Sequence, residues 1–134
     1  MIEEFTISTN KEQELVDVTG KVEELVAKSG VKNGLCVVYV PHATASVTIN
    51  ENADPNITLD IIDALNEAVR SHDWRHDRID GNAHAHIKSA ILGSSRSIPV
   101  KDGKLMLGTW QDIFFCEFDG PRSQRRIIVT VVES

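Results

Sequence analysis

Apolar residues follow two different spacings along the chain, and these spacings predict its elements. In eight short segments, apolar and polar residues alternate or β-branched residues run together, as is typical of strands. The predicted strands are 3–9, 14–17, 35–40, 44–50, 97–100, 104–107, 113–118 and 125–133. In segments 18–29 and 59–70 the apolar residues recur at helical spacing, which predicts two helices.

Three connecting segments carry further signals. Segment 71–83 is long, charged and irregular, and long loops inside a small domain are more often functional than idle. Segment 84–92 fits either a strand or a short helix, and the apolar residues before Gly93 favour a helical turn that ends there. Asp102-Gly103 predicts a hairpin turn between two strands.

Many short strands and two modest helices predict an α+β fold. The expected architecture is a mixed β-sandwich, jelly-roll-like, with two packed sheets and two main helices over one side. The length of 134 residues fits a single domain, residues 1–134. A domain of this size has little room for a deep pocket within one chain, so an active site between subunits is plausible.

Composition narrows the classes of partner. The formal net charge of −6 argues against nucleic acid as a partner, because that binding depends on an excess of Lys and Arg. No apolar run approaches the ~20 residues that cross a bilayer, so we expect no membrane partner. The N-terminus is acidic and alternates apolar with polar residues, unlike a signal peptide, so we expect a cytoplasmic protein. In that reducing compartment Cys36 and Cys116 are expected to be buried thiols.

The histidines are the first candidates for chemistry. Neutral imidazoles suit Zn²⁺ and similar ions, and three protein ligands leave a position open for water or substrate. His42, His76 and His86 are the favoured metal ligands. The same three rings without a metal can bind phosphate or act as acid and base near neutral pH. Solvent-exposed histidines without a function are the plain alternative.

Two carboxylates stand in unusual surroundings. Glu51 lies between Asn50 and Asn52, which suggests a hydrogen-bonded polar cluster, although a solvated loop is the alternative. Glu117 interrupts an apolar strand, and a buried lone carboxylate is costly. We therefore expect Glu117 to have a partner such as Arg122, Lys88 or a metal, unless its side chain faces outward.

Trp110, Gln111 and Arg122 complete the candidate set. The Trp110 ring can stack on an aromatic ligand while the neighbouring Gln111 amide binds polar atoms, although Trp is also a common core residue. Arg122 belongs to a basic patch with Arg125 and Arg126, and guanidinium groups bind phosphate well. Solvated surface side chains are the alternative for all three arginines.

Four motifs together resemble a known family. They are His42–Ser46 with Ile49–Glu51, Ala85–Lys88 with Leu92–Gly93, Gly108–Gln111, and Asp119–Arg122. In this order they resemble the YjbQ-like family, also called UPF0047 or the secondary thiamine-phosphate synthase family. The resemblance covers nearly the whole chain. Ala43 stands where many members carry Thr or Ser, and His84 lies outside the motif.

The resemblance implies a fold, an activity and a set of partners. It implies small cytoplasmic homotrimers with a site near subunit contacts. The implied activity is thiamine-phosphate synthesis, which joins hydroxymethylpyrimidine diphosphate to thiazole phosphate and releases pyrophosphate. His42 and His86 correspond to the motif histidines, with His76 as the expected third ligand of a divalent metal, zinc or magnesium.

The candidate residues fit that chemistry in part. Lys88 and Arg122 are expected to hold the diphosphate of a small phosphorylated metabolite, and Trp110 to stack on the pyrimidine. The expected catalytic residues are Glu51, Lys88, Glu117 and Arg122, and the expected substrate-binding residues are Asn50, Trp110 and Gln111. Two alternatives stay open: a non-enzymatic trimer that binds a metal or a phosphorylated metabolite, and a metal-dependent hydrolase of unknown substrate.

Overall fold

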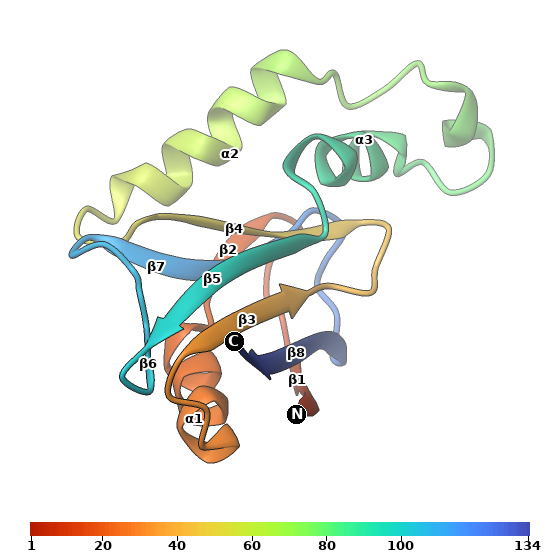
Figure 1. The fold of residues 1–134 in the computed structure, drawn as a ribbon. Helices are drawn as coiled ribbons and strands as arrows, with labels where there is room; N and C mark the ends of the chain where they lie inside the picture. The colour runs from red at the N-terminus through yellow and green to blue at the C-terminus, as the bar shows by residue number, and fades with distance from the viewer.

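Eight strands form two antiparallel sheets (Figure 1). The computed structural model describes all residues, 1–134. The five-stranded sheet has the order β1 (Ile2–Ile7), β8 (Arg125–Glu133), β3 (Gly34–Tyr39), β5 (Ser95–Lys101) and β6 (Lys104–Leu105). The three-stranded sheet has the order β2 (Glu14–Asp17), β7 (Gln111–Glu117) and β4 (Ala45–Glu51). Each predicted strand is present, with ends shifted by a few residues at most.

Three α-helices and one short 3-10 helix complete the chain. They are α1 (Thr19–Ser29), α2 (Asn56–Ala68), η1 (Arg75–Arg78) and α3 (Ala83–Leu92). The ambiguous segment is therefore a helix, and the irregular loop before it contains η1. Helix α1 ends at Gly30, whose φ of 72° is left-handed, as the glycine predicts. The Asp102-Gly103 turn is also confirmed, because both residues have positive φ values, 53° and 77°.

The main core lies between the two sheets and is closed by α1. Sixteen buried residues form it, and α1, β3, β4, β5, β7 and β8 all contribute. From α1, Val22 and Val26 reach this core, whereas the alternating residues of β8 supply Ile127, Val129 and Val131. The buried side chains thus recur every three to four residues in the helix and every two residues in the strand.

A second, smaller core lies on the other face of the three-stranded sheet. There α3 contributes Ala85, β7 contributes Phe114 and Cys116, and Phe118 comes directly after β7. Figure 1 shows α2 and α3 on this side of the molecule and α1 on the other. The central strand β7 is therefore covered on both faces, which explains why its sequence is a continuous apolar run.

The α+β class and the two packed sheets are confirmed, with two corrections in detail. All ladders are antiparallel, in place of the mixed sheets expected. The helices lie on two sides rather than one, and α3 is a third helix besides the two predicted. Cys36 and Cys116 are both free and buried, as predicted. No helix has the length and apolar character needed to span a membrane.

Candidate functional site

His42 is held in one orientation by the backbone of β8. It lies in the connection between β3 and β4, and its Nε2 accepts a hydrogen bond of 2.8 Å from the backbone N–H of Arg126. Burial lowers the pKa of His42, and the nearby charges of Arg125 and Arg126 lower it further. Because Nε2 accepts a proton donor, the neutral ring carries its own proton on Nδ1. His42 is therefore a neutral hydrogen-bond donor at Nδ1.

A hollow of about 390 Å³ lies on one side of His42. We call it the histidine hollow, because His42 from the β3–β4 connection and His86 from α3 both line it. Most of its other lining residues are small: Ala43, Ala45, Ser89, Ala90, Gly93 and Ser94. The prediction that the fold brings His42 and His86 close to one another is therefore confirmed for the single chain.

A second hollow of about 240 Å³ also contacts His42, and it has no apolar lining residue. We call it the arginine hollow, because its other lining residues are Arg122, Ser123, Gln124 and Arg125. Arg122 donates from Nε and Nη2 to Asp119, at 2.9 Å each, so its Nη1 group is free to bind a ligand. This hollow offers several N–H and O–H donors and no carboxylate.

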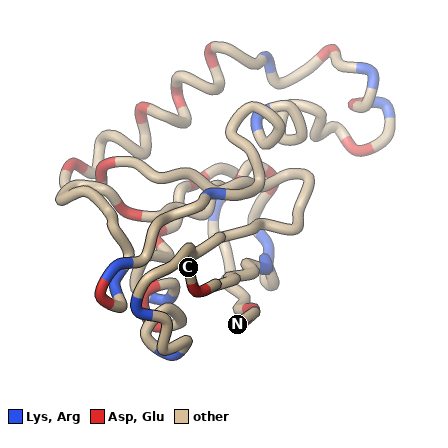
Figure 2. Tube along the Cα trace, viewed as in Figure 1, with Lys and Arg blue, Asp and Glu red and all other residues tan.

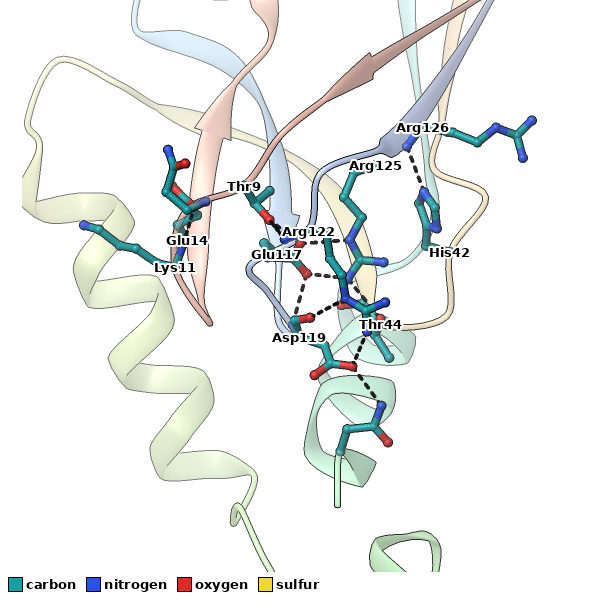
Figure 3. A network of polar contacts seen from close by, with 12 residues as sticks. Thr9, Lys11, Glu14, His42, Thr44, Glu117, Asp119, Arg122, Arg125 and Arg126 are labelled. Carbon is teal, nitrogen blue, oxygen red and sulfur yellow. Dashed lines mark hydrogen bonds and ion pairs between the residues drawn. The ribbon is translucent and has the colours of Figure 1, made fainter. Parts of the chain in front are cut away.

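A buried ion pair lies beside His42 (Figure 3). Arg125 at the start of β8 donates from Nε to Glu117 Oε1 at 2.8 Å and from Nη2 to Glu117 Oε2. Glu117 is at the end of β7, so the pair links the two sheets. Thr9 also donates to Glu117, and Thr44 accepts from Arg125. The partner of Glu117 is thus Arg125, not the predicted Arg122, Lys88 or metal.

The three-histidine metal site is not assembled within one chain. The rings of His76 and His86 meet edge to face with 4.8 Å between their centroids. His42, however, has its Nε2 occupied by a backbone N–H and a proton on Nδ1, so neither nitrogen offers a free lone pair. No set of three His, Cys, Asp or Glu side chains in the chain is arranged to hold an ion. A divalent metal at His42, His76 and His86 stays a prediction, which these placements do not fit.

Lys88 is fully buried and lines neither hollow. Its Nζ contacts three uncharged acceptors: Gln13 Oε1 at 3.1 Å, Asn66 Oδ1 at 2.5 Å and His84 Nδ1 at 3.1 Å. Burial lowers the pKa of the Lys88 ammonium group, which Glu12 partly offsets. In the single chain Lys88 joins α2, α3 and the segment before β2, and it does not reach the phosphate position expected for it.

The other predicted residues lie at the far end of the three-stranded sheet. Glu51 pairs with Gln111 in the β4–β7 ladder, whereas Ala45 pairs with Glu117 at the end near His42. A strand rises ~3.3 Å per residue, so the two ends are about 20 Å apart. One chain therefore does not bring Glu51 and His42 together as two walls of the same site.

This far group has its own local contacts. Trp110 is 64% exposed, and its carbonyl oxygen accepts the N–H of Asn52 at 3.0 Å. The Asn50 side chain accepts the N–H of Glu51 at 2.7 Å, and the Gln111 side chain accepts that of Gly108 at 2.8 Å. Their roles in binding substrate stay predictions, and only a second chain can bring them to the His42 end.

Two residues beside His42 were not among the candidate site residues. Arg125 was seen only as part of a surface patch, but its position two residues before Ile127 on an alternating strand indicates the buried face. Ser89 lies one turn after His86 on α3, so the two share a helix face. The helical spacing would have revealed Ser89 once segment 84–92 was identified as a helix.

The fold and the hollows at His42 define a small α+β protein with two antiparallel sheets and a polar site at one end. The model of the UPF0047 protein YjbQ-like family matches residues 3–134, and the chain belongs to this family. A UPF0047 protein of Methanocaldococcus jannaschii is 48% identical over 132 residues, which are 98% of this chain and 94% of that protein. UPF0047 protein YugU of Bacillus subtilis is 42% identical over 92% of this chain and 94% of its own.

Solved structures agree with this assignment. A YbjQ-like protein of unknown function from Sulfolobus solfataricus superposes with a TM-score of 0.96 at 44% identity, covering 100% of this chain and 97% of that one. A YjbQ/UPF0047 family protein from Clostridium acetobutylicum gives a TM-score of 0.93 at 45% identity, covering 97% and 99%. The names of these relatives state the family and no activity.

Proposed function

We propose that this protein binds a small phosphorylated metabolite at His42, with the phosphate in the arginine hollow. The observation that carries the proposal is the lining of that hollow: Arg122, Arg125, a serine, a glutamine and the neutral His42 ring, with no carboxylate and no apolar side chain. Guanidinium N–H groups bind phosphate oxygens strongly, and neutral donors add hydrogen bonds without needing a proton.

The rigidity of these donors supports the same proposal. Arg125 is fixed by Glu117, Arg122 by Asp119, and His42 by the backbone of Arg126 (Figure 3). A set of donors that is already ordered loses little conformational freedom when a ligand binds. The acidic partners reduce the net positive charge, so the site relies on directed hydrogen bonds more than on overall attraction.

Thiamine-phosphate synthesis is the reaction that we propose for this site, on the strength of the family resemblance. In that reaction hydroxymethylpyrimidine diphosphate loses pyrophosphate, and the thiazole nitrogen forms the new bond. Arg122 and His42 would stabilise the negative charge that grows on the departing pyrophosphate. Glu117 does not act as a base in this scheme, because Arg125 and Thr9 already hold its carboxylate.

Pyrophosphate binding tests the proposal directly. Calorimetric titration should show binding to the native protein, and Arg122→Ala should weaken it about 10- to 100-fold, as expected for losing a charged hydrogen bond. The exposed Arg75→Ala, which lines neither hollow, is the matched control and should leave the dissociation constant unchanged. Equal affinity in the native protein and Arg122→Ala, or no binding at all, would contradict the proposal.

A non-enzymatic binding protein is the second candidate. It is favoured by the absence of any Asp or Glu among the residues that line the two hollows, which leaves no free carboxylate as a general base. Incubating the native protein with both precursors and measuring thiamine phosphate distinguishes the two. Product that is lost in His86→Ala and kept in the exposed His72→Ala supports the enzyme, whereas tight binding without product supports the second candidate.

We further propose that the chain forms a homotrimer through the outer face of the five-stranded sheet. Leu35 and Tyr39 on β3 and Val132 on β8 are 38%, 44% and 47% exposed on this face, and no part of the chain covers them. Arg126, whose backbone N–H holds His42, lies on β8 on the same outer face, so a partner there would lie close to the site.

The oligomeric state checks this second proposal. Light scattering behind a sizing column should give three times the mass of one chain for the native protein. Tyr39→Glu should shift the population to monomers, because a charge would then be buried without a partner. Lys21→Glu, at an exposed position of α1 and outside this sheet, is the control. A native protein that elutes as a monomer contradicts the proposal.

A further inference from the structure

An apolar row crosses the outer face of the five-stranded sheet. Leu35 on β3 lies opposite Val132 on β8 and opposite Pro99 on β5. Just past β6, the N–H of Met106 donates to the carbonyl oxygen of Pro99 at 2.9 Å, so Met106 extends the row. All four side chains are exposed, because the residues next to them in each strand pack into the main core. We call these four residues the apolar row.

A ring of three identical chains cannot form by joining the apolar row to its own copy. A patch that meets its own copy is related to it by a two-fold axis, and the assembly then stops at two chains. Around a three-fold axis, one patch of each chain meets a different patch of the next chain. The proposed homotrimer therefore requires a second surface on each chain that fits the apolar row.

Trp110 has the properties expected of that second surface. Its ring is largely exposed, whereas tryptophan side chains are on average highly buried in folded proteins. The turn that carries it is ordered, because Gly108 donates to the Gln111 side chain at 2.8 Å and Asn52 donates to the Trp110 carbonyl oxygen at 3.0 Å. A large ring on an ordered turn loses little freedom on binding, and tryptophan is enriched among the residues that dominate interfaces.

The charges beside the two surfaces are complementary. Lys101 follows two positions after Pro99 on β5, so it lies on the same outer face. Glu51 pairs in the β4–β7 ladder with Gln111, the residue after Trp110. Neither Lys101 nor Glu51 forms an ion pair within the chain. Each surface thus has an unpaired charge of opposite sign to the other, which favours a contact between the two.

We infer that Trp110 of each chain packs on the apolar row of the next chain around the ring, with Glu51 beside Lys101. The occupant of the apolar row is therefore a second copy of this chain. The inference rests on the proposed homotrimer and adds which two surfaces meet. It gives the exposed ring of Trp110 a role in assembly that does not depend on any ligand.

Two variants that each lose one surface test the inference. Trp110→Glu keeps the apolar row, and Val132→Glu keeps Trp110. The mass of each variant alone, and of an equal mixture of the two, is measured by light scattering behind a sizing column. Ile91→Glu is the matched control, because Ile91 is 59% exposed on α3 and belongs to neither surface. Circular dichroism shows whether each variant keeps the native fold.

We expect each variant alone to have the mass of one chain, because the new carboxylate would be buried in the contact without a partner. The mixture should give the mass of two chains, since one intact Trp110 can meet one intact apolar row and no third chain can be added. Ile91→Glu should keep the mass of three chains. The inference alone is overturned if Trp110→Glu stays trimeric, if the mixture stays at one chain, or if Ile91→Glu also dissociates. A native protein that is not a trimer overturns the proposed homotrimer and this inference with it.

Discussion

Glu117→Gln should lower the free energy of unfolding by about 3–5 kcal/mol, because it leaves the Arg125 guanidinium buried without its counter-charge. Glu117 and Arg125 are 0% and 4% exposed, so water cannot replace the lost partner. Urea unfolding followed by circular dichroism measures the change. The exposed pair of Lys28 and Glu3, 2.9 Å apart, is the control, and Glu3→Gln should cost less than about 1 kcal/mol.

The same ion pair predicts how stability depends on pH. Burial raises the pKa of Glu117, but the hydrogen bonds from Arg125 and Thr9 outweigh it, so the pKa is held below its ordinary value. The unfolded state then binds the proton more readily, and the stability that Glu117 contributes is full above its unfolded pKa and lost as the pH falls through the folded value. In Glu117→Gln the acid-side decline should be shallower. An unchanged decline would show that other carboxylates cause it.

Lys88→Ala should lower the free energy of unfolding by about 3 kcal/mol, the second-largest effect that we expect. The change removes three hydrogen bonds at once and leaves His84 Nδ1 buried without a donor. Urea unfolding again measures it, and the exposed Lys101→Ala should be within about 0.5 kcal/mol of the native protein. A loss of pyrophosphate binding at unchanged stability would instead return Lys88 to the ligand site.

Local patterns predicted most of the fold. Strand β8 was expected at 125–133 and is found at Arg125–Glu133, because a long β-branched run leaves little ambiguity. Helix α2 begins at Asn56, earlier than the predicted residue 59, and Asp54 accepts the N–H of Asn56 just before its start. The assignment of strands to sheets depends on contacts between distant segments, which no local pattern contains.

The site was harder to predict than the fold. His42 and His86 were expected to converge and do so, although 43 other residues separate them in the chain. The partner of Glu117 was missed because three arginines lie within five positions, and only the register of β8 decides which one turns inward. The placement of Glu51 and Trp110 at the opposite end follows from the antiparallel pairing of β4 with β7.

Helix α2 differs from the other helices in how it is attached. None of its residues is buried, its acidic residues are spaced along it (Figure 2), and it is fastened by Leu65 against the smaller core and by Asn66 to Lys88. Because the helix has few contacts with the rest of the chain, its local unfolding should cost much less free energy than separating the two sheets. We therefore expect the backbone amides of α2 to exchange with solvent faster than those of β7 and β8.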